Sequence, residues 1–192
     1  MNRKIVLLIS LTLLSFLIRS VTAQEVAPDF TLTDIYGIEF SLSDYRGKVI
    51  LLDFFDTSCI PCLEEIPHLN SLHEEFNEDL VIISISVSPS LDTVEKLQQF
   101  RQEHEIDWIL ARDTIGIYDE YNVQYIPTLV IVDQEGYIQR RHVGLTDESV
   151  LKEEIYEIIP EFGTWASIIF VFLTLTVAAL THKRRSLLRK IQ

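Results

Sequence analysis

Cysteine is scarce in this sequence, since Cys59 and Cys62 are the only two among 192 residues. A closed zinc site needs four ligands, and no second Cys pair is present to complete one. A structural disulfide across so short a loop would constrain little of the unfolded chain. Internal repeats and low-complexity segments are also absent, so the length suits one domain with targeting segments. A redox role is therefore the favoured interpretation of the Cys pair, with half a zinc site or a structural bridge as alternatives.

Basic residues are scarce in the middle of the chain. All 29 acidic residues lie between residues 24 and 182, together with only eight of the 16 basic residues. A domain with this charge should repel nucleic acid and anionic lipid head groups. We therefore expect no nucleic-acid partner. Solubility is the simplest explanation of the charge, which says little about the substrate.

The N-terminal segment, residues 1–23, has the pattern of a secretory signal peptide. Arg3 and Lys4 precede an apolar run over residues 5–18, and residues 21–23 offer small side chains for cleavage. The apolar run has 14 residues, which is short for a membrane span of about 20 residues. An uncleaved anchor is the alternative.

The C-terminal segment predicts a single membrane span. Residues 162–181 carry no charge, and a helix of this length matches a hydrocarbon core of about 30 Å. The basic tail, residues 182–192, places the C-terminus in the cytoplasm by the positive-inside rule. We therefore expect residues 24–159 to form a domain that faces outside the cytoplasm, on a single-pass anchor in the cell membrane.

Four residues before this span suggest a second interpretation of the C-terminus. Pro160-Glu161-Phe162-Gly163, followed by an apolar segment and a basic tail, resembles the PEFG-CTERM sorting signals of certain archaeal surface proteins. The resemblance implies that an archaeosortase recognises the motif within residues 160–181 and removes the helix. A permanent anchor is the alternative.

Hydrophobic periodicity predicts an α/β domain between these ends, because strand patterns alternate with helix patterns. Strands or short apolar runs are expected over residues 30–33, 39–42, 49–55, 80–87, 108–110, 128–132 and 137–143. Helices are expected over residues 63–76, from Ser90 as the N-cap to about His104, over residues 115–121 and over residues 147–159. The central strands should pair in parallel, and the last two should form an antiparallel hairpin.

The Cys pair lies between a predicted buried strand and a predicted helix. This order places Cys59 at a helix N-terminus, where backbone N–H groups and the helix dipole stabilise a thiolate. A thiolate is the species that attacks disulfides, so Cys59 is the candidate nucleophile. Cys62, one helical turn further on, should resolve the mixed disulfide. This chemistry calls for no cofactor and no metal.

Three motifs together resemble the thioredoxin superfamily, and more closely its TlpA/ResA-like membrane-associated thiol–disulfide oxidoreductases, over about residues 26–159. Ala27-Pro28-Asp29-Phe30 and the following hairpin resemble the N-terminal extension of that branch. Residues 59–67 match its Cys-x-Pro-Cys-x-x-Glu-x-Pro signature, and Tyr125-Ile126-Pro127-Thr128 matches the cis-proline loop. The resemblance implies a thioredoxin-like fold, in which helices flank a central mixed β-sheet and a β-hairpin extends the N-terminus.

The resemblance also implies roles for two acidic residues. Asp53 matches the buried acid of thioredoxins, and desolvation in an apolar strand should raise its pKa to a value that suits proton exchange. Its alternative is a surface residue at a strand end. Glu65 lies on the same helical side as Cys62, where the matching acid of ResA-like proteins lines the active site. Its alternative is an ordinary solvated helix charge.

The cis-proline loop is the predicted substrate-binding element. Pro127 should carry a cis peptide bond that faces the disulfide, which would expose the backbone of Ile126 to an extended substrate peptide. Pro67 is expected to kink the active-site helix. The sequence departs from the family at Ser58, where a Trp is usual, and this difference should alter partner docking and the exposure of Cys59.

The histidines of the central domain form no evident constellation, and we expect His68, His73, His104 and His142 to be surface or packing residues.

The favoured function is an extracytoplasmic oxidoreductase that reduces or reshuffles disulfides in proteins, served by an exported or membrane redox partner. A peroxiredoxin-like peroxidase is one alternative, but it needs a proline where Leu52 stands. An SCO-type copper-delivery module is another, and it needs Cys-x-x-x-Cys spacing.

Overall fold

The computed structural model describes residues 24–159. The predicted signal peptide, sorting motif, C-terminal membrane helix and basic tail lie outside the described residues. Within residues 24–159, every helix is too short or too polar to cross a bilayer.

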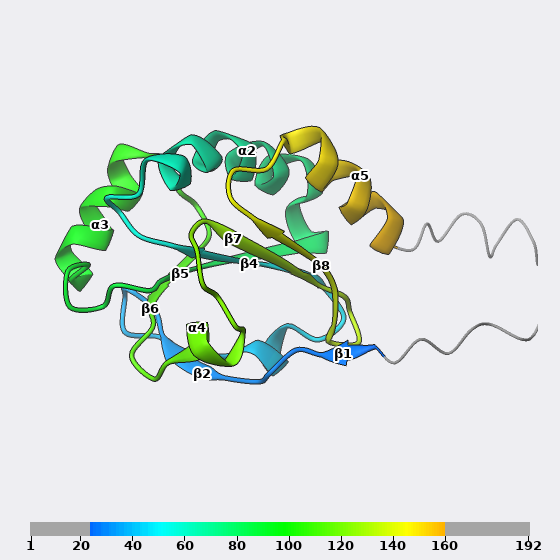
Figure 1. Ribbon diagram of the computed structural model, residues 1–192, viewed down its shortest axis with the longest axis horizontal. Helices are drawn as coiled ribbons and strands as arrows, with labels where there is room; N and C mark the ends of the chain where they lie inside the picture. The colour runs from blue at the N-terminus through cyan, green and yellow to red at the C-terminus, as the bar shows by residue number, and fades with distance from the viewer. Residues whose placement is uncertain (1–23, 160–192) are drawn as a thin grey trace, which may run out of the picture.

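A mixed six-stranded sheet forms the middle layer of the domain (Figure 1). Its strand order is β1-β8-β7-β4-β5-β6. The strands are β1 (Glu25–Val26), β4 (Val49–Phe55), β5 (Leu80–Ser86), β6 (Ile109–Arg112), β7 (Thr128–Val132) and β8 (Tyr137–Val143). β4 pairs in parallel with β5, and β5 with β6, whereas β7 is antiparallel to both β4 and β8. The predicted parallel centre and late antiparallel hairpin are therefore confirmed.

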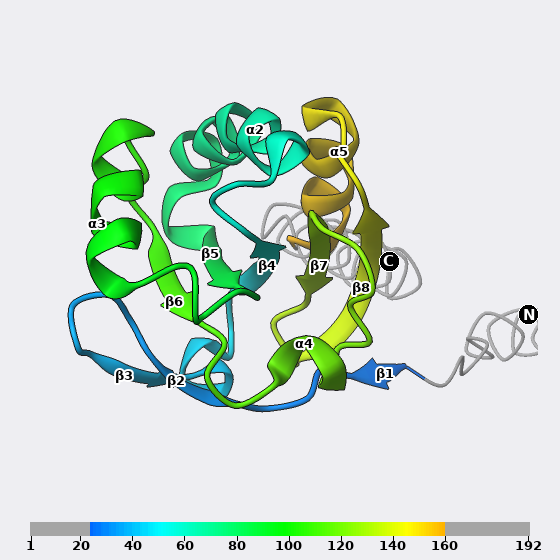
Figure 2. The ribbon, with the colours of Figure 1, turned by 60° about the vertical axis from the view of Figure 1, so that its left-hand side comes forward.

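Helices cover both faces of the sheet (Figures 1 and 2). Three helices lie on one face, namely α2 (Ile60–Phe76), α3 (Val94–Glu103) and α5 (Glu148–Ile158). The other face carries the short helix α4 (Ile117–Glu120) and the hairpin of β2 (Thr31–Thr33) and β3 (Glu39–Ser41). Two 3₁₀ turns complete the described elements, η1 (Leu42–Tyr45) and η2 (Asn77–Asp79). Each face has its own apolar core, and β4 contributes alternate side chains to both.

Strand β4 is buried along its whole length because it lies between two neighbouring strands and two covering layers. Its four apolar residues from Val49 to Leu52 are completely buried. Continuous apolar sequence is typical of a strand covered on both faces. The strand ends at Phe55, and the loop that follows carries the Cys pair to the edge of the sheet.

Two helix starts differ by three residues from the sequence prediction. Helix α2 begins at Ile60, three residues before the apolar periodicity, because Cys59 caps it and Pro61 suits the first helical turn. Helix α3 begins at Val94, and its N-cap is Thr93 rather than Ser90. The Thr93 side chain accepts a hydrogen bond from the Lys96 N–H, which satisfies a free donor at the helix end.

The predicted N-terminal hairpin is confirmed, and aromatic contacts hold it to the domain. Phe30 packs edge-on against Phe40 and Tyr121, with ring centroids 6.4 and 6.3 Å apart. The buried Tyr121 hydroxyl donates to the Pro28 carbonyl at 2.7 Å. Strand β1, which the sequence did not predict, adds two residues to the edge of the sheet beside β8.

Candidate active site

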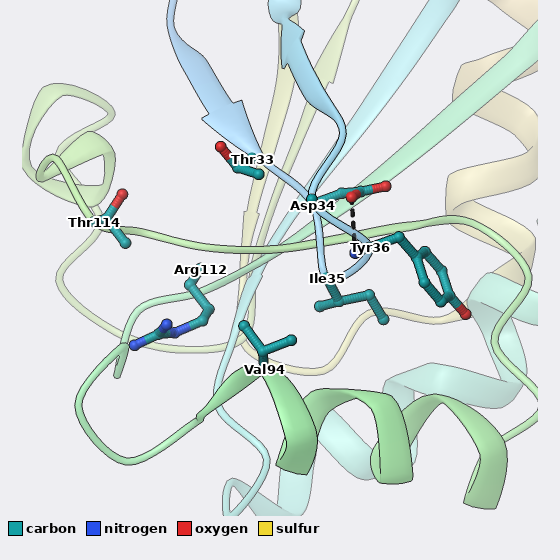
Figure 3. A pocket seen from close by; sticks show the side chains of 8 residues that line it. Thr33, Asp34, Ile35, Tyr36, Val94, Arg112 and Thr114 are labelled. Carbon is teal, nitrogen blue, oxygen red and sulfur yellow. Dashed lines mark hydrogen bonds between the residues drawn. The ribbon is translucent and has the colours of Figure 1, made fainter.

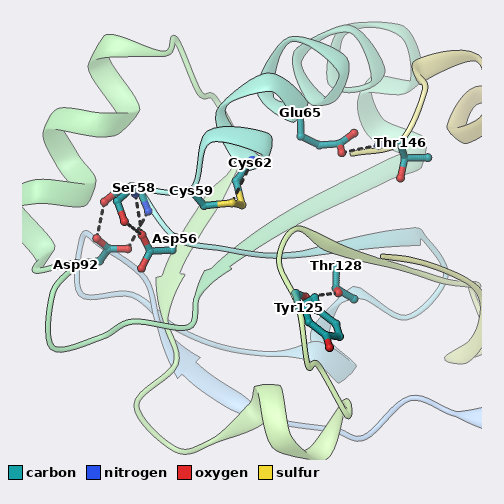
Figure 4. The surroundings of a disulfide bond; sticks show 10 residues. Asp56, Ser58, Cys59, Cys62, Glu65, Asp92, Tyr125, Thr128 and Thr146 are labelled. Carbon is teal, nitrogen blue, oxygen red and sulfur yellow. Dashed lines mark hydrogen bonds between the residues drawn. A yellow bond between two sulfur atoms is a disulfide. The ribbon is translucent and has the colours of Figure 1, made fainter. Parts of the chain in front are cut away.

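The two cysteines form a disulfide at the edge of the sheet where β4, β5 and β6 end. The Cys59–Cys62 bond has an S–S distance of 2.11 Å and a Cα–Cα distance of 5.2 Å. Cys59 is half-buried, whereas Cys62 is only 4% exposed. Figure 4 shows the pair at the first turn of α2, as its position before a helix predicts. An incoming partner can therefore reach Cys59 much more easily than Cys62.

Cys59 is the N-cap of α2, and its sulfur accepts a hydrogen bond from the Cys62 N–H at 3.2 Å. The first N–H groups of a helix have no partner within the helix, so they are available to stabilise an anion at this position. The same N–H group would stabilise a Cys59 thiolate once the disulfide is reduced. The predicted location of the first thiol at a helix N-terminus is confirmed.

Asp53 is buried in β4, which contradicts the alternative of a surface residue. The Ser84 hydroxyl on neighbouring β5 donates to its carboxylate at 2.7 Å, and the Trp108 indole N–H donates to the Ser84 oxygen at 2.9 Å. Burial raises the pKa of Asp53 to about 7, the Ser84 hydrogen bond acts against this change, and the charge of Glu65 adds to it. A carboxyl group with this pKa can take up or release a proton near neutral pH.

Glu65 is also buried, with only 1% of its surface exposed, so the alternative of a solvated helix charge is wrong. Its Oε2 accepts a hydrogen bond from the Thr146 N–H at 2.9 Å, and Figure 4 shows its carboxyl group turned toward Thr146. Burial raises the pKa of Glu65, although the Thr146 N–H and His68 partly oppose this effect. Its Oε1 is buried and makes no hydrogen bond with any described residue.

His68 lies beside Glu65, although the sequence suggested only a surface or packing role for it. Its Nδ1 is 2.8 Å from the Thr146 carbonyl oxygen and 3.5 Å from Glu65 Oε1. The imidazole is 29% exposed, so it is in contact with solvent while Glu65 is not. The position of His68 one turn after Glu65 was visible in the sequence. Its contact with Thr146 could not be seen, because 78 residues separate the two.

The other three histidines follow the sequence prediction. His73 packs against Trp108, and His104 packs against Phe100. His142 contacts Glu154 at 2.7 Å on the surface between β8 and α5.

The cis-proline loop enters β7 at the edge of the sheet that also carries the disulfide. The Ile126–Pro127 peptide bond is cis, as predicted, and the Pro127 carbonyl accepts a hydrogen bond from the Gly144 N–H at 2.7 Å. Thr128 Oγ1 donates to the Tyr125 carbonyl at 2.7 Å, while the Tyr125 ring is 71% exposed. A cavity of about 310 Å³ adjoins this loop and is lined by Val87, Tyr118, Val123, Gln124, Tyr125 and Ile126. The loop therefore combines an apolar hollow with an exposed tyrosine.

The loop between β4 and Cys59 contains a polar network that the sequence prediction missed. Asp56 accepts hydrogen bonds from the Ser58 N–H and hydroxyl at 2.7 and 2.5 Å. Asp92, from the loop before α3, accepts from the Thr57 N–H at 3.1 Å and from the Thr57 hydroxyl at 2.5 Å. Both carboxylates are buried, although they lie beside an accessible cysteine. The sequence offered no signal for this pairing, because 35 residues separate Thr57 from Asp92.

A second cavity of about 440 Å³ lies beside the hairpin turn (Figure 3). It is lined by Thr33, Asp34, Ile35, Tyr36, Gly37, Val94, Arg112 and Thr114. Asp34 Oδ1 accepts from the backbone N–H groups of Tyr36 and Ile38, each at 2.8 Å, so it serves the turn itself. Arg112 donates to the Pro89 carbonyl. None of the predicted site residues lines this cavity.

Comparisons with known proteins identify the family of this chain. The model of the AhpC/TSA family matches residues 23–141. The thioredoxin-like protein YneN of Bacillus subtilis is 31% identical over 68% of this chain and 77% of its own length. The thiol–disulfide oxidoreductase ResA of Geobacillus kaustophilus is 32% identical over 73% of this chain and 80% of its own.

Among solved structures, a putative thiol:disulfide interchange protein DsbE from Chlorobium tepidum is similar, with a TM-score of 0.65 and 25% identity. The similarity covers 73% of this chain and all of that one. The chain belongs to the AhpC/TSA family, and it is a thioredoxin-like thiol–disulfide oxidoreductase of the ResA/DsbE type.

Proposed function

We propose that this protein exchanges disulfides with other proteins outside the cytoplasm, and that it mainly reduces or reshuffles them. The observation that carries the proposal is the difference between its two sulfurs. Cys59 is accessible and caps a helix, whereas Cys62 is buried behind it. This asymmetry supports Cys59 as the nucleophile and Cys62 as the resolving thiol.

In the proposed reaction, the Cys59 thiolate attacks one sulfur of a partner disulfide. The partner S–S bond breaks, its second sulfur leaves as a thiolate and takes a proton, and a mixed disulfide forms. Cys62 then loses its proton and attacks Cys59, which restores the Cys59–Cys62 bond and releases the other partner sulfur. Two electrons and two protons pass to the partner in total.

Asp53 is the proposed base for Cys62. Its pKa of about 7 allows it to accept a proton when Cys62 is attacking and to return the proton when the reaction runs backward. Glu65 is the proposed second acid of the site, because it is buried on α2, the helix that also carries Cys62, and its charge affects Asp53. His68, which is partly exposed, would link Glu65 to solvent.

Ile126 and Pro127 are the proposed contacts to substrate. The backbone of Ile126 would pair with an extended peptide, as in other cases of strand addition. The hollow beside Tyr125 would accept an apolar side chain of the substrate. Protein thiols and disulfides are therefore the proposed substrates, and an exported or membrane protein would supply electrons.

The location outside the cytoplasm is a proposal that depends on the sequence of the two ends. The basic and apolar pattern of residues 1–23 and 160–192 supports export and a single membrane anchor. Removal of the C-terminal helix after a sorting motif is the alternative to a permanent anchor. The mass of the mature chain distinguishes the two, since processing would end it near residues 160–163.

The peroxidase and copper-delivery alternatives gain no support at this site. Position 52 is occupied by Leu52, which is buried in β4, so the proline of a peroxidatic motif is missing. Cys59 and Cys62 have two residues between them and are bonded to each other, whereas a copper-delivery module needs three residues between its cysteines.

Trapping of mixed disulfides tests the proposed function. Cys62→Ser should accumulate disulfide-linked complexes with partner proteins, because Cys59 can attack but nothing resolves the product. Cys59→Ser should accumulate few, because Cys62 is buried. Non-reducing gels of whole cells that carry each variant make the measurement. Equal trapping by the two variants, or by neither, would overturn the assignment.

A membrane-impermeant thiol reagent tests the location. It should label reduced Cys59 in intact cells, and labelling that appears only after permeabilisation would contradict the proposal.

A further inference from the structure

Two buried carboxylates, those of Asp56 and Asp92, accept hydrogen bonds from Thr57 and Ser58 in the loop that connects β4 to Cys59. Asp56 accepts from the backbone and side chain of Ser58, the residue immediately before Cys59. Asp92 accepts from Thr57 and also from the Ser86 hydroxyl at 2.7 Å. Figure 4 shows both carboxyl groups beside Ser58 and close to the disulfide. The residues next to the nucleophile are thus surrounded by acidic groups.

Both carboxyl groups are ionised at neutral pH. Burial alone would raise the pKa of Asp56, but hydrogen bonds from Ser58 and Ser88 outweigh it and lower the pKa. Burial would likewise raise the pKa of Asp92, but hydrogen bonds from Lys96, Thr57 and Ser86 lower it. The number of donors that point at each group explains why the charge is retained.

Lys96 on α3 pairs with Asp92 of this cluster, and Arg112 donates to the Pro89 carbonyl in the same loop as Asp92. Lys96 Nζ lies 2.8 Å from Asp92 Oδ1, and its side chain is 46% exposed. Lys96 also lines a cavity between α2 and α3, together with Glu103 and His104. Glu64 is exposed on α2, while Asp53 and Glu65 are buried and have raised pKa values. Asp56 and Asp92 with Lys96 therefore leave a net negative charge beside Cys59.

These charges act against the helix N-terminus. The N–H groups of α2 stabilise a Cys59 thiolate, whereas a nearby anion destabilises it. The strongest oxidants of this superfamily are oxidants because their reduced form, with its thiolate, is stabilised. A destabilised thiolate has the opposite effect, because it favours the disulfide form and makes the dithiol a better electron donor.

We infer that Asp56 and Asp92 are electrostatic tuning residues, which lower the fraction of Cys59 that is ionised and bias the Cys59–Cys62 pair toward donating electrons. The two acids do not touch the reacting sulfur, so they act through their charge and through the loop that they hold. The inference depends on the proposed exchange function for its meaning in the cell. The effect on Cys59 itself does not depend on any partner.

Asp56→Asn tests the negative charge of Asp56 separately from the hydrogen bond that holds the loop. The amide keeps the size and the oxygen that accepts from the Ser58 N–H, but it removes the negative charge. We expect the apparent pKa of Cys59 to fall by about one unit. At pH values above both thiol pKa values, the equilibrium with glutathione should shift about tenfold toward the dithiol, which corresponds to roughly 30 mV in reduction potential, and the shift should be smaller at pH values where the thiol is protonated.

Lys96→Met gives the opposite test. It removes the cation that pairs with Asp92, so the pKa of Cys59 should rise and the glutathione equilibrium should shift toward the disulfide. Asp133→Asn is the matched control. Asp133 is a buried carboxylate that accepts from the N–H groups of Glu135 and Tyr137, but it follows β7 at the opposite edge of the sheet. We expect the pKa of Cys59 to be unchanged in Asp133→Asn.

The measurement uses the full chain, reduced, in detergent. The rate of alkylation of Cys59 by iodoacetamide is followed by mass spectrometry from pH 4 to 10. A lower pKa in Asp56→Asn together with a higher one in Lys96→Met supports the inference. Unchanged values in both, a shift of either variant in the wrong direction, or an equal shift in Asp133→Asn overturns it. If Asp56→Asn does not fold, the sign of the Lys96→Met shift decides alone.

The proposed function can fail independently of this inference. If the pKa values shift as expected but no mixed disulfides form in cells, the exchange proposal fails and the tuning role stands. If mixed disulfides form but the pKa values do not move, the two acids only hold the loop.

Discussion

Two pairs of buried carboxylates flank the disulfide, and they behave in opposite ways. On the side of Cys62, Asp53 and Glu65 have raised pKa values, and each accepts a single hydrogen bond, from Ser84 and Thr146 respectively. On the side of Cys59, Asp56 and Asp92 have lowered pKa values and accept several. All four have little exposed surface, although Asp53 lies deepest in the domain. The depth of burial and the number of hydrogen-bond donors together decide whether a carboxyl group is a proton carrier or a fixed anion.

The comparison predicts that the fixed anions matter more for stability. Asp92→Ala should lower the free energy of unfolding by about 2–4 kcal/mol, because the donors of Thr57, Ser86 and Lys96 lose their acceptor. Urea unfolding followed by circular dichroism measures this change. Asp53→Asn is the control, and it should leave the stability nearly unchanged or slightly higher at pH 7, since it removes a desolvated ionisable group. A larger loss of unfolding free energy in Asp53→Asn than in Asp92→Ala would contradict this prediction.

The proton carriers should matter more for rate. Asp53→Asn should slow exchange with a model disulfide near neutral pH by up to about 10²-fold, the lower end of what a general acid–base group contributes. Water at the accessible site can replace part of the lost function, so exchange should persist. The measurement is the exchange rate as a function of pH. If both proteins give the same rate and profile, Asp53 is only structural and Glu65 becomes the better candidate.

The two pairs should also respond to pH in opposite directions. The folded pKa of Asp53, about 7, lies above its ordinary value of 3.8, so its folded state binds the extra proton between these values. Stability from this group is therefore present at low pH and is lost as the pH rises toward 7, by about 2 kcal/mol between pH 5 and 7. Asp56 and Asp92 have lowered pKa values, so their contribution is present above the ordinary Asp pKa and is lost on further acidification.

Unfolding experiments at several pH values check this difference. Between pH 5 and 7, wild type should lose stability relative to Asp53→Asn. A constant difference between the two proteins over that range would show that Asp53 has an ordinary pKa.

His68 should have the smallest effect of the residues considered. His68→Gln removes the imidazole that lies 3.5 Å from Glu65 but keeps a polar side chain of similar length. Since the charge of His68 lowers the pKa of Glu65, this variant should raise that pKa slightly and change the exchange rate by about threefold or less. His73→Gln, on the same helix but packed against Trp108, is the control for a packing effect. Equal changes in both variants would argue against a link between His68 and Glu65.

Most of the fold could be predicted from the sequence, because its elements carry local signals. β4 is a continuous apolar run, β7 follows a recognisable Tyr-Ile-Pro-Thr motif, and Cys59 precedes a periodic helix. The start of α3 was misplaced because Ser90 and Thr93 are both good N-caps, and only the folded backbone shows that the Thr93 side chain accepts from Lys96. Strand β1 was missed because two residues carry no periodicity.

The candidate site was predictable only where residues are close in the sequence. Asp53 and Glu65 stand at fixed distances from the Cys pair, so both could be named. Asp92 reaches Thr57 across 35 residues, and His68 reaches Thr146 across 78. Contacts of this kind depend on how separate loops meet at one edge of the sheet, and a single sequence holds no local pattern for them.

The segment from Gly144 to Thr146 serves two parts of the site at once. Its first N–H binds the Pro127 carbonyl, and its last N–H binds the buried Glu65 carboxylate. The cis-proline loop, which would bind substrate, and Glu65, which would transfer a proton, are thus linked by one segment of three residues. The position of the cis-proline loop and the position of the donor to Glu65 are therefore set by the same short segment of backbone.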